Sequence, residues 1–320
     1  MRILLTGASG FVGSAVQARL LADGVHALRS AFRVLPEKTV VTGDVCIAPD
    51  LGPDGDWRHA LAGIDTVIHC AARVHVMAEQ EVDPLAAFRR ANTEGTLRLA
   101  QQAAEAGVKR FVFLSSLKVN GEKSDPGRAF RADDAPALAD PYGISKWEAE
   151  EGLLNVARET GMAVVIIRPP LVYGPGVKAN FLSMMRWLHR GVPLPFGAID
   201  NRRSLVALDN LVDLILVCLE HPAAANQRFM VSDGEDVSIS ALLRRLGAAL
   251  NAPVRLIPVP QYWIETGARL VGRDDLSRRL CGSLQVDIGK TRNLLDWAPP
   301  VSLDQALAKA ATHYLDTLKK

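Results

Sequence analysis

The sequence predicts an α/β fold, in which helices wrap both faces of a doubly wound parallel sheet and a smaller, mostly helical lobe follows. Three observations lead to this prediction. Short β-rich runs alternate with helical stretches in the first half of the chain. Runs such as Phe111–Leu114 and Val164–Ile167 are apolar without alternation, which is typical of parallel strands buried on both faces. The 320 residues are 48% hydrophobic, enough to fill a large core.

The elements of the first half follow in the order of a doubly wound sheet. We expect strands at Arg2–Thr6, Val25–Ala31, Val40–Asp44, Thr66–His69, Phe111–Ser115 and Ala163–Arg168. We expect helices at Phe11–Asp23, at about Asp83–Gly107 and at about Pro141–Thr160.

The pattern changes after Pro170, where glycine and proline become frequent and helices dominate. We expect these helices at about Asn180–His189, Asp209–Glu220, Ser238–Leu250, Tyr262–Gly272 and Leu303–Leu315. The sequence thus predicts a dinucleotide-binding domain over residues 1–170 and a substrate-binding lobe over residues 171–320. The boundary is soft, because sheet elements can return after residue 170.

Composition predicts a cytoplasmic protein without nucleic-acid or membrane partners. The net charge is +2, from 37 basic and 35 acidic residues. No secretory segment follows Met1, and the apolar run Leu211–Leu219 contains Asp213 and is too short to span a bilayer. The four cysteines form no CxxC pair, so we expect reduced thiols and no metal site.

A glycine-rich loop follows the first predicted strand and opens the first helix. Gly7, Gly10 and Gly13 permit a tight turn, close approach of a pyrophosphate and close packing of helix on strand. Ser9, Phe11 and Val12 complete this loop. Strand, loop and helix in this order predict a Rossmann dinucleotide site.

The end of the second predicted strand bears on the choice of cofactor. An acidic residue there favours NAD, whereas a basic one accommodates the 2′-phosphate of NADP. The stretch Arg29–Arg33 holds two arginines and no carboxylate, so NADP(H) is favoured and NAD(H) is possible, with Arg33 as the phosphate contact. The alternative is that both arginines are solvated. Asp44 and Val45 are placed to meet the adenine, although Asp44 equally suits a cap.

A tyrosine and a lysine lie one turn apart at the start of a predicted helix. Asp140 is a good N-cap and Pro141 a good first residue, so Tyr142 and Lys146 share one face. The lysine ammonium and the helix dipole are expected to favour the phenolate and make a tuned proton carrier. Ser115 and Ser116 end a buried strand, where a doubly wound sheet places its ligands.

Together these motifs resemble the extended short-chain dehydrogenase/reductases of the UDP-galactose 4-epimerase-like group. The resemblance runs from Met1 to about Trp297. It rests on GASGFVG (Gly7–Gly13), GDV (Gly43–Val45), NTEGT (Asn92–Thr96), FVFLSSLKVNG (Phe111–Gly121), YGISK (Tyr142–Lys146), RPPLVYGPG (Arg168–Gly176) and NRRSLVALDNLVD (Asn201–Asp213).

The resemblance implies roles for individual residues. Ser116 aligns with the catalytic hydroxyl, Tyr142 with the acid/base, and Lys146 with the residue that tunes it and holds the nicotinamide ribose. The cofactor site further takes in Cys70, Ala71, Ala72, Asn92 and Pro169. The substrate is implied to be a UDP-sugar, bound by Ser115, Ser116, Asn180, Arg203 and, more loosely aligned, Arg279. Lys118 either orients the sugar or stays in solvent.

Departures from the family pattern favour one reaction. Related dehydratases carry an Asp-Glu pair where this chain has Leu117 and Lys118, and authentic 4-epimerases carry an aromatic residue and an asparagine where it has Pro170 and Leu171. The motifs look most like bacterial nucleotide-sugar 4-ketoreductases. They imply NAD(P)H-dependent reduction of a UDP-4-keto-6-deoxy-N-acetylhexosamine, to a product such as UDP-N-acetylquinovosamine, in surface polysaccharide (O-antigen) synthesis.

Two alternatives and an assembly state accompany this expectation. One alternative is a UDP-sugar 4-epimerase with tightly bound NAD, and the other is a non-catalytic dinucleotide sensor. Family members often pair the helices at about Asp83–Gly107 and Pro141–Thr160 between subunits, so we expect a homodimer. The apolar residues of these helices are equally explained by packing on the sheet.

Overall fold

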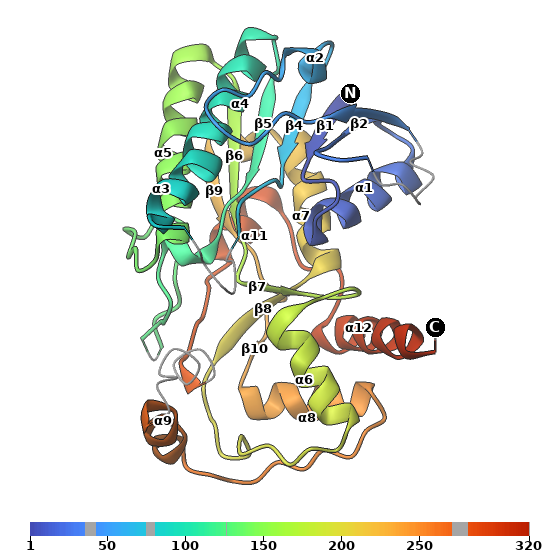
Figure 1. Ribbon diagram of the computed structural model, residues 1–320, viewed down its shortest axis with the longest axis vertical. Coiled ribbons are helices and arrows are strands. Elements are labelled where there is room, and N and C mark those ends of the chain that lie inside the picture. Colours follow the sequence, from blue (N-terminus) through green and yellow to red (C-terminus); the bar gives the residue numbers. More distant parts are fainter. Residues whose placement is uncertain (36–42, 75–80, 126, 271–280, 320) are drawn as a thin grey trace.

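The large sheet dominates the computed structural model, which describes residues 1–35, 43–74, 81–125, 127–270 and 281–319. It has seven strands, all parallel, in the order β3-β2-β1-β4-β5-β6-β9 (Figure 1). The strands are β1 (Arg2–Thr6), β2 (Ala27–Phe32), β3 (Asp44–Ile47), β4 (Thr66–His69), β5 (Arg110–Leu114), β6 (Ala163–Arg168) and β9 (Gln227–Met230). The predicted parallel α/β fold is confirmed.

Helices cover both faces of this sheet, as its apolar strands require. One face carries α1 (Phe11–Asp23), α7 (Leu208–Glu220) and α11 (Gly289–Leu295), which share a buried cluster with residues of β1, β6 and β9 (Figure 1). The other face carries α2 (Arg58–Leu61), α3 (Pro84–Phe88), α4 (Gly95–Glu105) and α5 (Pro141–Thr160). The four cysteines are free thiols.

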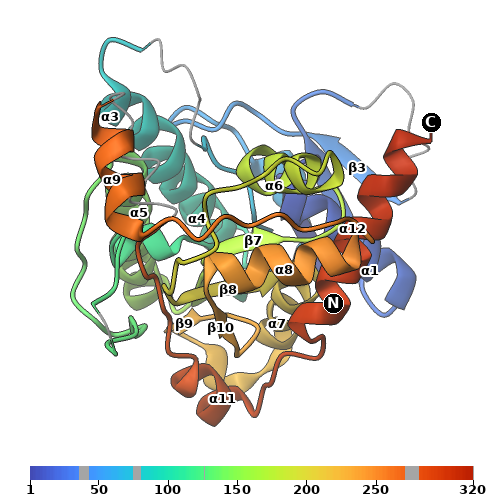
Figure 2. The ribbon, with the colours of Figure 1, turned by 90° about the horizontal axis from the view of Figure 1, so that it is seen from below.

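A second, smaller sheet organises the C-terminal lobe. Its strands are β7 (Leu171–Tyr173), β8 (Arg203–Ala207) and β10 (Asp236–Val237), in the order β10-β8-β7. Around it pack α6 (Ala179–His189), α8 (Ile239–Ala249) and α12 (Leu303–Leu318), with α9 (Gln261–Leu270) at the periphery (Figures 1 and 2). The lobe buries its own core, which includes Tyr173, Phe181, Leu243 and Leu307.

Several elements differ from the sequence prediction. β2 begins at Ala27 because Gly24 ends α1 in a left-handed conformation (φ 65°) and leaves Val25 73% exposed. The third strand is described over Asp44–Ile47, where Asp44 pairs with Arg29 and Ile47 with Phe32, and most of the predicted strand Val40–Asp44 precedes the described residues. Residues 36–42 lie outside the described part.

The long helix predicted over residues 83–107 is divided by a π-helical turn, Arg89–Glu94, between α3 and α4. Short 3-10 turns lie at Leu117–Val119 (η2) and Pro222–Ala224 (η3). Along the described ranges, no helix has both the length and the apolar character needed to cross a membrane.

Candidate active site

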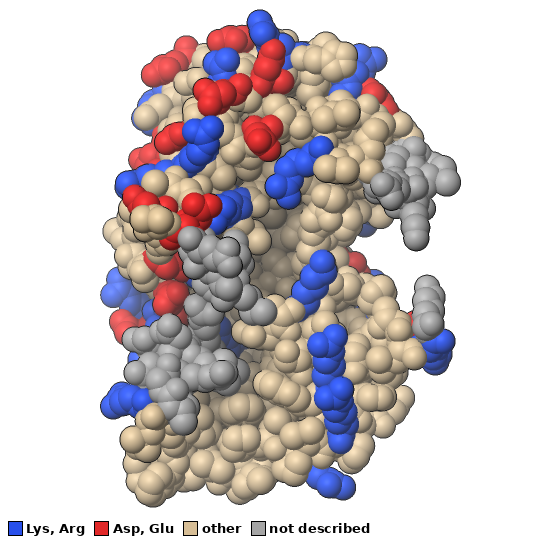
Figure 3. Space-filling view, viewed as in Figure 1, with Lys and Arg blue, Asp and Glu red and all other residues tan. Residues whose placement is uncertain are grey.

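A cavity of about 1200 Å³ opens at the carboxyl ends of the central strands. This is the place where a doubly wound sheet binds its ligands. The surface is hollowed between the large-sheet part and the C-terminal lobe (Figure 3). The cavity is lined by many of the site residues that the sequence predicted, namely Gly7, Ser9, Gly10, Phe11, Val12, Gly13, Arg33, Cys70, Ala71, Ala72, Ser115, Ser116, Tyr142, Lys146 and Pro169.

The glycine loop has the geometry of a phosphate cradle. Gly7 has φ 73°, and a Cβ there would lie 2.7 Å from the backbone nitrogen of Ala71. A Cβ on Gly13 would lie 2.0 Å from the carbonyl oxygen of Gly7. Gly10 is the N-cap of α1 and supplies no side-chain cap, so the amides of the first turn are left for a ligand. These residues therefore fit the pyrophosphate of a dinucleotide.

The two arginines of the second strand have different surroundings. Arg29 Nε donates to Asp44 Oδ2 at 2.7 Å, and its Nη1 donates to the carbonyls of Ala60 and Ala62 at 3.1 Å. Arg33 lines the cavity. Of the described residues at this edge, Ala48–Gly52 form the wall, whereas Asp44 and Val45 do not.

The tyrosine and lysine lie on α5, at the positions that the cap signals predict. Asp140 Oδ1 accepts the backbone N–H of Gly143 at 2.6 Å, which confirms the predicted N-cap. Lys146 is 2% exposed, and its Nζ donates to the carbonyl of Leu114 at 2.9 Å. The same Nζ lies 6.0 Å from the Tyr142 ring centroid.

The electrostatics of this pair differ from the expectation. Burial raises the pKa of Tyr142 to about 12, the charge of Asp140 adds to this, and a hydrogen bond with Ser116 opposes it. Burial lowers the pKa of Lys146 to about 8. The expected stabilisation of the phenolate is outweighed, because desolvation is the larger effect and the ammonium binds Leu114 instead.

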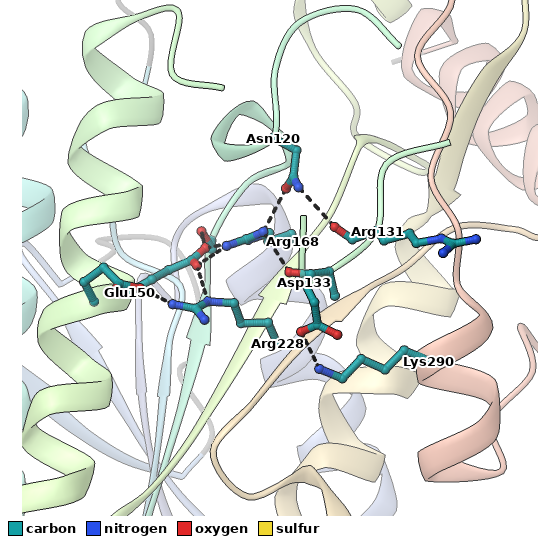
Figure 4. Close-up of polar contacts among 10 residues, drawn as sticks. Asn120, Arg131, Asp133, Glu150, Arg168, Arg228 and Lys290 are labelled. Carbon is teal, nitrogen blue, oxygen red and sulfur yellow. Dashed lines mark hydrogen bonds and ion pairs between the residues drawn. The ribbon is translucent and has the colours of Figure 1, made fainter. Parts of the chain in front are cut away.

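Figure 4 shows a buried ion-pair network around Glu150, which is linked to the site through Ser115. Glu150, one turn beyond Lys146, accepts the Ser115 hydroxyl at 2.5 Å. Arg168 donates to both Glu150 oxygens, at 2.9 and 2.5 Å, and Arg228 Nε donates at 3.0 Å. Glu150 and Arg168 have no exposed surface. Sequence reasoning missed this network, although the spacing from Lys146 to Glu150 places both on one helix face.

Asn92 lies behind the cavity wall. Its side chain accepts the N–H of Arg73 at 2.8 Å and donates to the carbonyl of Arg73 at 3.0 Å and to Ser145 Oγ at 3.1 Å. Through Asn92, the π-helical turn therefore connects the loop after β4 with α5. Arg73 itself lines the cavity and was not predicted as a contact.

Several of the predicted substrate-binding residues lie away from the cavity. Within the described chain, Lys118, Asn180 and Arg203 are not in the cavity wall. Lys118 forms an ion pair with Asp140, and Arg203 donates to the carbonyl of Gly282 at 2.8 Å. Asn180 is exposed on α6, and Arg279 lies outside the described residues. No group of three or more His, Cys, Asp or Glu side chains among the described residues is arranged to hold a metal ion.

Comparisons with known proteins identify the family and the fold of this chain. Residues 3–232 match the NAD dependent epimerase/dehydratase family. A UDP-glucose 4-epimerase from Vibrio cholerae is 46% identical over 314 residues, covering 98% of this chain and 95% of that protein. A Thermotoga maritima UDP-glucose 4-epimerase solved with UDP-glucose superimposes with a TM-score of 0.78 at 23% identity, over 99% of this chain and 100% of that one. RMD from Pseudomonas aeruginosa, solved with NADPH, gives 0.74 at 24% identity, over 98% and 99%.

Proposed function

This chain belongs to the NAD dependent epimerase/dehydratase family, and on that premise we propose that it is a UDP-sugar 4-epimerase that holds NAD tightly. The observation that carries the proposal is the joint placement of Ser116, Tyr142 and Lys146 in one cavity with the glycine loop. The 46% identity to a UDP-glucose 4-epimerase over nearly the full length supports this reaction. The sequence motifs alone favour the ketoreductase and leave the epimerase as the alternative.

The chain's own residues account for the proton at the sugar O4. Bound NAD supplies the acceptor, and then the donor, for the hydride at C4. In its phenolate form, Tyr142 takes the O4 proton as C4 is oxidised to a ketone, and the resulting phenol returns the proton when C4 is reduced from the other face. Ser116 hydrogen-bonds the same oxygen. Lys146, held by the Leu114 carbonyl, places a positive charge behind the phenolate as it forms.

The C-terminal lobe is proposed to bind the substrate, and the protein is proposed to form a dimer. Residues 171–320 bind the UDP part of the substrate, with Asn180, Arg203 and Arg279 on the diphosphate side. The two arginines suit this role because a guanidinium group matches the geometry of a phosphate. We propose a cytoplasmic homodimer. The four free thiols support a reducing compartment.

A 4-ketoreductase is the second candidate, and Arg33 is the observation that favours it. Arg33 lines the cavity, and the adjoining stretch carries no carboxylate. This arrangement suits an exchangeable NADPH better than a permanently held NAD. Pro170 also lines the cavity, where the authentic 4-epimerase pattern has a larger side chain. The proposed reaction is reduction of a UDP-4-keto-6-deoxy-N-acetylhexosamine for surface polysaccharide synthesis.

One experiment separates the two reactions. The purified protein is incubated without added cofactor with UDP-glucose or UDP-N-acetylglucosamine, and the sugars are separated by chromatography. In parallel, NADPH absorbance is followed with the 4-keto sugar. Formation of the C4 epimer, with NAD released on denaturation, supports the epimerase. NADPH consumption without epimer formation would move the assignment to the ketoreductase, and neither result in a folded protein would contradict both.

Replacing Arg33 by alanine is expected to alter cofactor preference. Loss of a charged phosphate contact should weaken NADPH binding by about 10-fold to 100-fold and change NADH binding by less than about twofold. Titration calorimetry on cofactor-free protein measures both affinities. Arg90→Ala is the matched control, since Arg90 also lines the cavity but pairs with Asp54 at 3.2 Å. Equal losses of NADPH and NADH in Arg33→Ala would contradict the assigned role.

A further inference from the structure

Ser116 and Tyr142 lie on different elements, and a lysine of the serine turn reaches the N-cap of the tyrosine helix. Ser116 is the N-cap of η2, and Lys118 lies in that turn. The Lys118 ammonium forms an ion pair with Oδ2 of Asp140, two residues before Tyr142. The other Asp140 oxygen accepts the Gly143 N–H at 2.6 Å. One carboxylate therefore caps the tyrosine helix and holds the serine turn at the same time.

Backbone packing at the same place shows how close the two elements are. A Cβ on Gly143 would lie 2.8 Å from the carbonyl oxygen of Lys118, so the first turn of α5 rests directly on η2. Lys118 keeps 31% of its side chain exposed, and Asp140 keeps 25%. Glu122 lies 3.6 Å from the same ammonium. The Lys118 ammonium thus lies between two carboxylates.

We propose that Lys118 is a positioning residue for the proton carrier: it fixes the tyrosine helix against the serine turn and neutralises the charge that Asp140 places beside Tyr142. The inference rests on the proposed role of Tyr142. Lys118 stands at a position where related dehydratases carry an acidic residue.

The groups facing Tyr142 define the electrostatic balance. On α5 and its N-cap they are Lys146 and Asp140, and from η2 it is Ser116, while Lys118 of the same turn pairs with Asp140. The Phe88 ring contacts Tyr142 edge-on at 5.9 Å, and the Arg73 guanidinium lies 5.6 Å over that phenylalanine. Of these groups Asp140 is the anion, and its charge raises the pKa of Tyr142.

Removal of Lys118 is expected to raise the pKa of Tyr142. Without Lys118, the Asp140 charge loses its ion-pair partner, and the pKa of the Tyr142 phenol rises further. A smaller fraction of the protein then holds the phenolate that accepts the O4 proton. The rising limb of the pH–activity profile should therefore move to a higher pH. At a fixed acidic pH, the rate should fall about tenfold if the pKa of Tyr142 rises by one.

The test is a set of pH–kcat profiles, with wild-type turnover established first. Lys118→Met is expected to move the rising limb up by about one pH unit. Lys118→Arg should restore it, and Asp140→Asn, which retains a good N-cap, should move it down. In the Asp140→Asn background, Lys118→Met should cause no further shift, because the lysine acts through that carboxylate.

A second readout keeps the inference testable if the protein turns over neither sugar. Phenolate absorbance is titrated in the cofactor-loaded protein, and each variant is compared with its own Tyr142→Phe counterpart. The same ordering of Tyr142 titration midpoints is expected. A Lys118→Met shift that persists in Asp140→Asn, or no shift in either readout, would overturn the inference. Unshifted profiles with a raised KM for the sugar would overturn it too, because Lys118 would then contact the substrate.

Discussion

Tyr142→Phe is expected to lower kcat by about 10³-fold to 10⁴-fold while the protein stays folded and keeps its cofactor. The substitution removes only the hydroxyl that carries the O4 proton. The ring remains, so the edge-on contact with Phe88 at 5.9 Å is retained. Initial rates of the C4 reaction, together with the NAD content after denaturation, measure the effect.

The matched comparison for this variant is Ser116→Ala. It removes the second hydroxyl at O4 and its hydrogen bond to Tyr142, and a smaller loss is expected because the proton carrier is intact. Activity of Tyr142→Phe within tenfold of wild type would contradict the role given to Tyr142.

Glu150→Ala is expected to lower the free energy of unfolding by about 3–5 kcal/mol. The change leaves Arg168 buried without its bidentate partner and removes the acceptor of the Ser115 hydroxyl. The neighbouring side chains cannot replace the negative charge of Glu150. Arg228 is itself a cation, and Trp147 is neutral and lies against the guanidinium groups of Arg168 and Arg228, at 5.7 and 5.1 Å. Urea denaturation followed by circular dichroism measures the change.

Glu148→Ala is the control on the same helix. Glu148 also binds an arginine, Arg89, at 2.5 Å, but the two side chains are 30% and 45% exposed. An exposed ion pair contributes little to stability because solvent screens it, so the free energy of unfolding of this variant should be close to that of wild type. Similar losses for the two variants would show that burial of the Glu150 network does not determine its effect.

The part of the site that the sequence predicted is encoded by short segments. The glycine loop, with Gly7 at φ 73°, and the α5 cap at Asp140 each depend on a few consecutive residues. Spacing within a helix then places Tyr142 and Lys146 on one face, as predicted. The pKa of Tyr142 was not predictable in this way, because it depends on burial by the whole fold.

The missed features depend on contacts between distant segments. Arg228 meets Glu150 across 78 positions of sequence, and nothing in either segment alone indicates the pair. The strands β7 and β10 have only 3 and 2 residues, too few for a periodic pattern. β9 returns to the large sheet beside β6 after the chain has passed through the C-terminal lobe, and the sequence allowed such a return after residue 170 without locating it.

The most direct test of the central claim follows the hydrogen at C4. UDP-glucose labelled with deuterium at C4 is incubated with the purified protein without added cofactor, and any UDP-galactose formed is analysed by mass spectrometry and NMR. The account predicts UDP-galactose that retains deuterium at C4, because the hydride leaves and returns within one site while Tyr142 exchanges only the O4 proton. Absence of the C4 epimer, or loss of the deuterium to water, would contradict it.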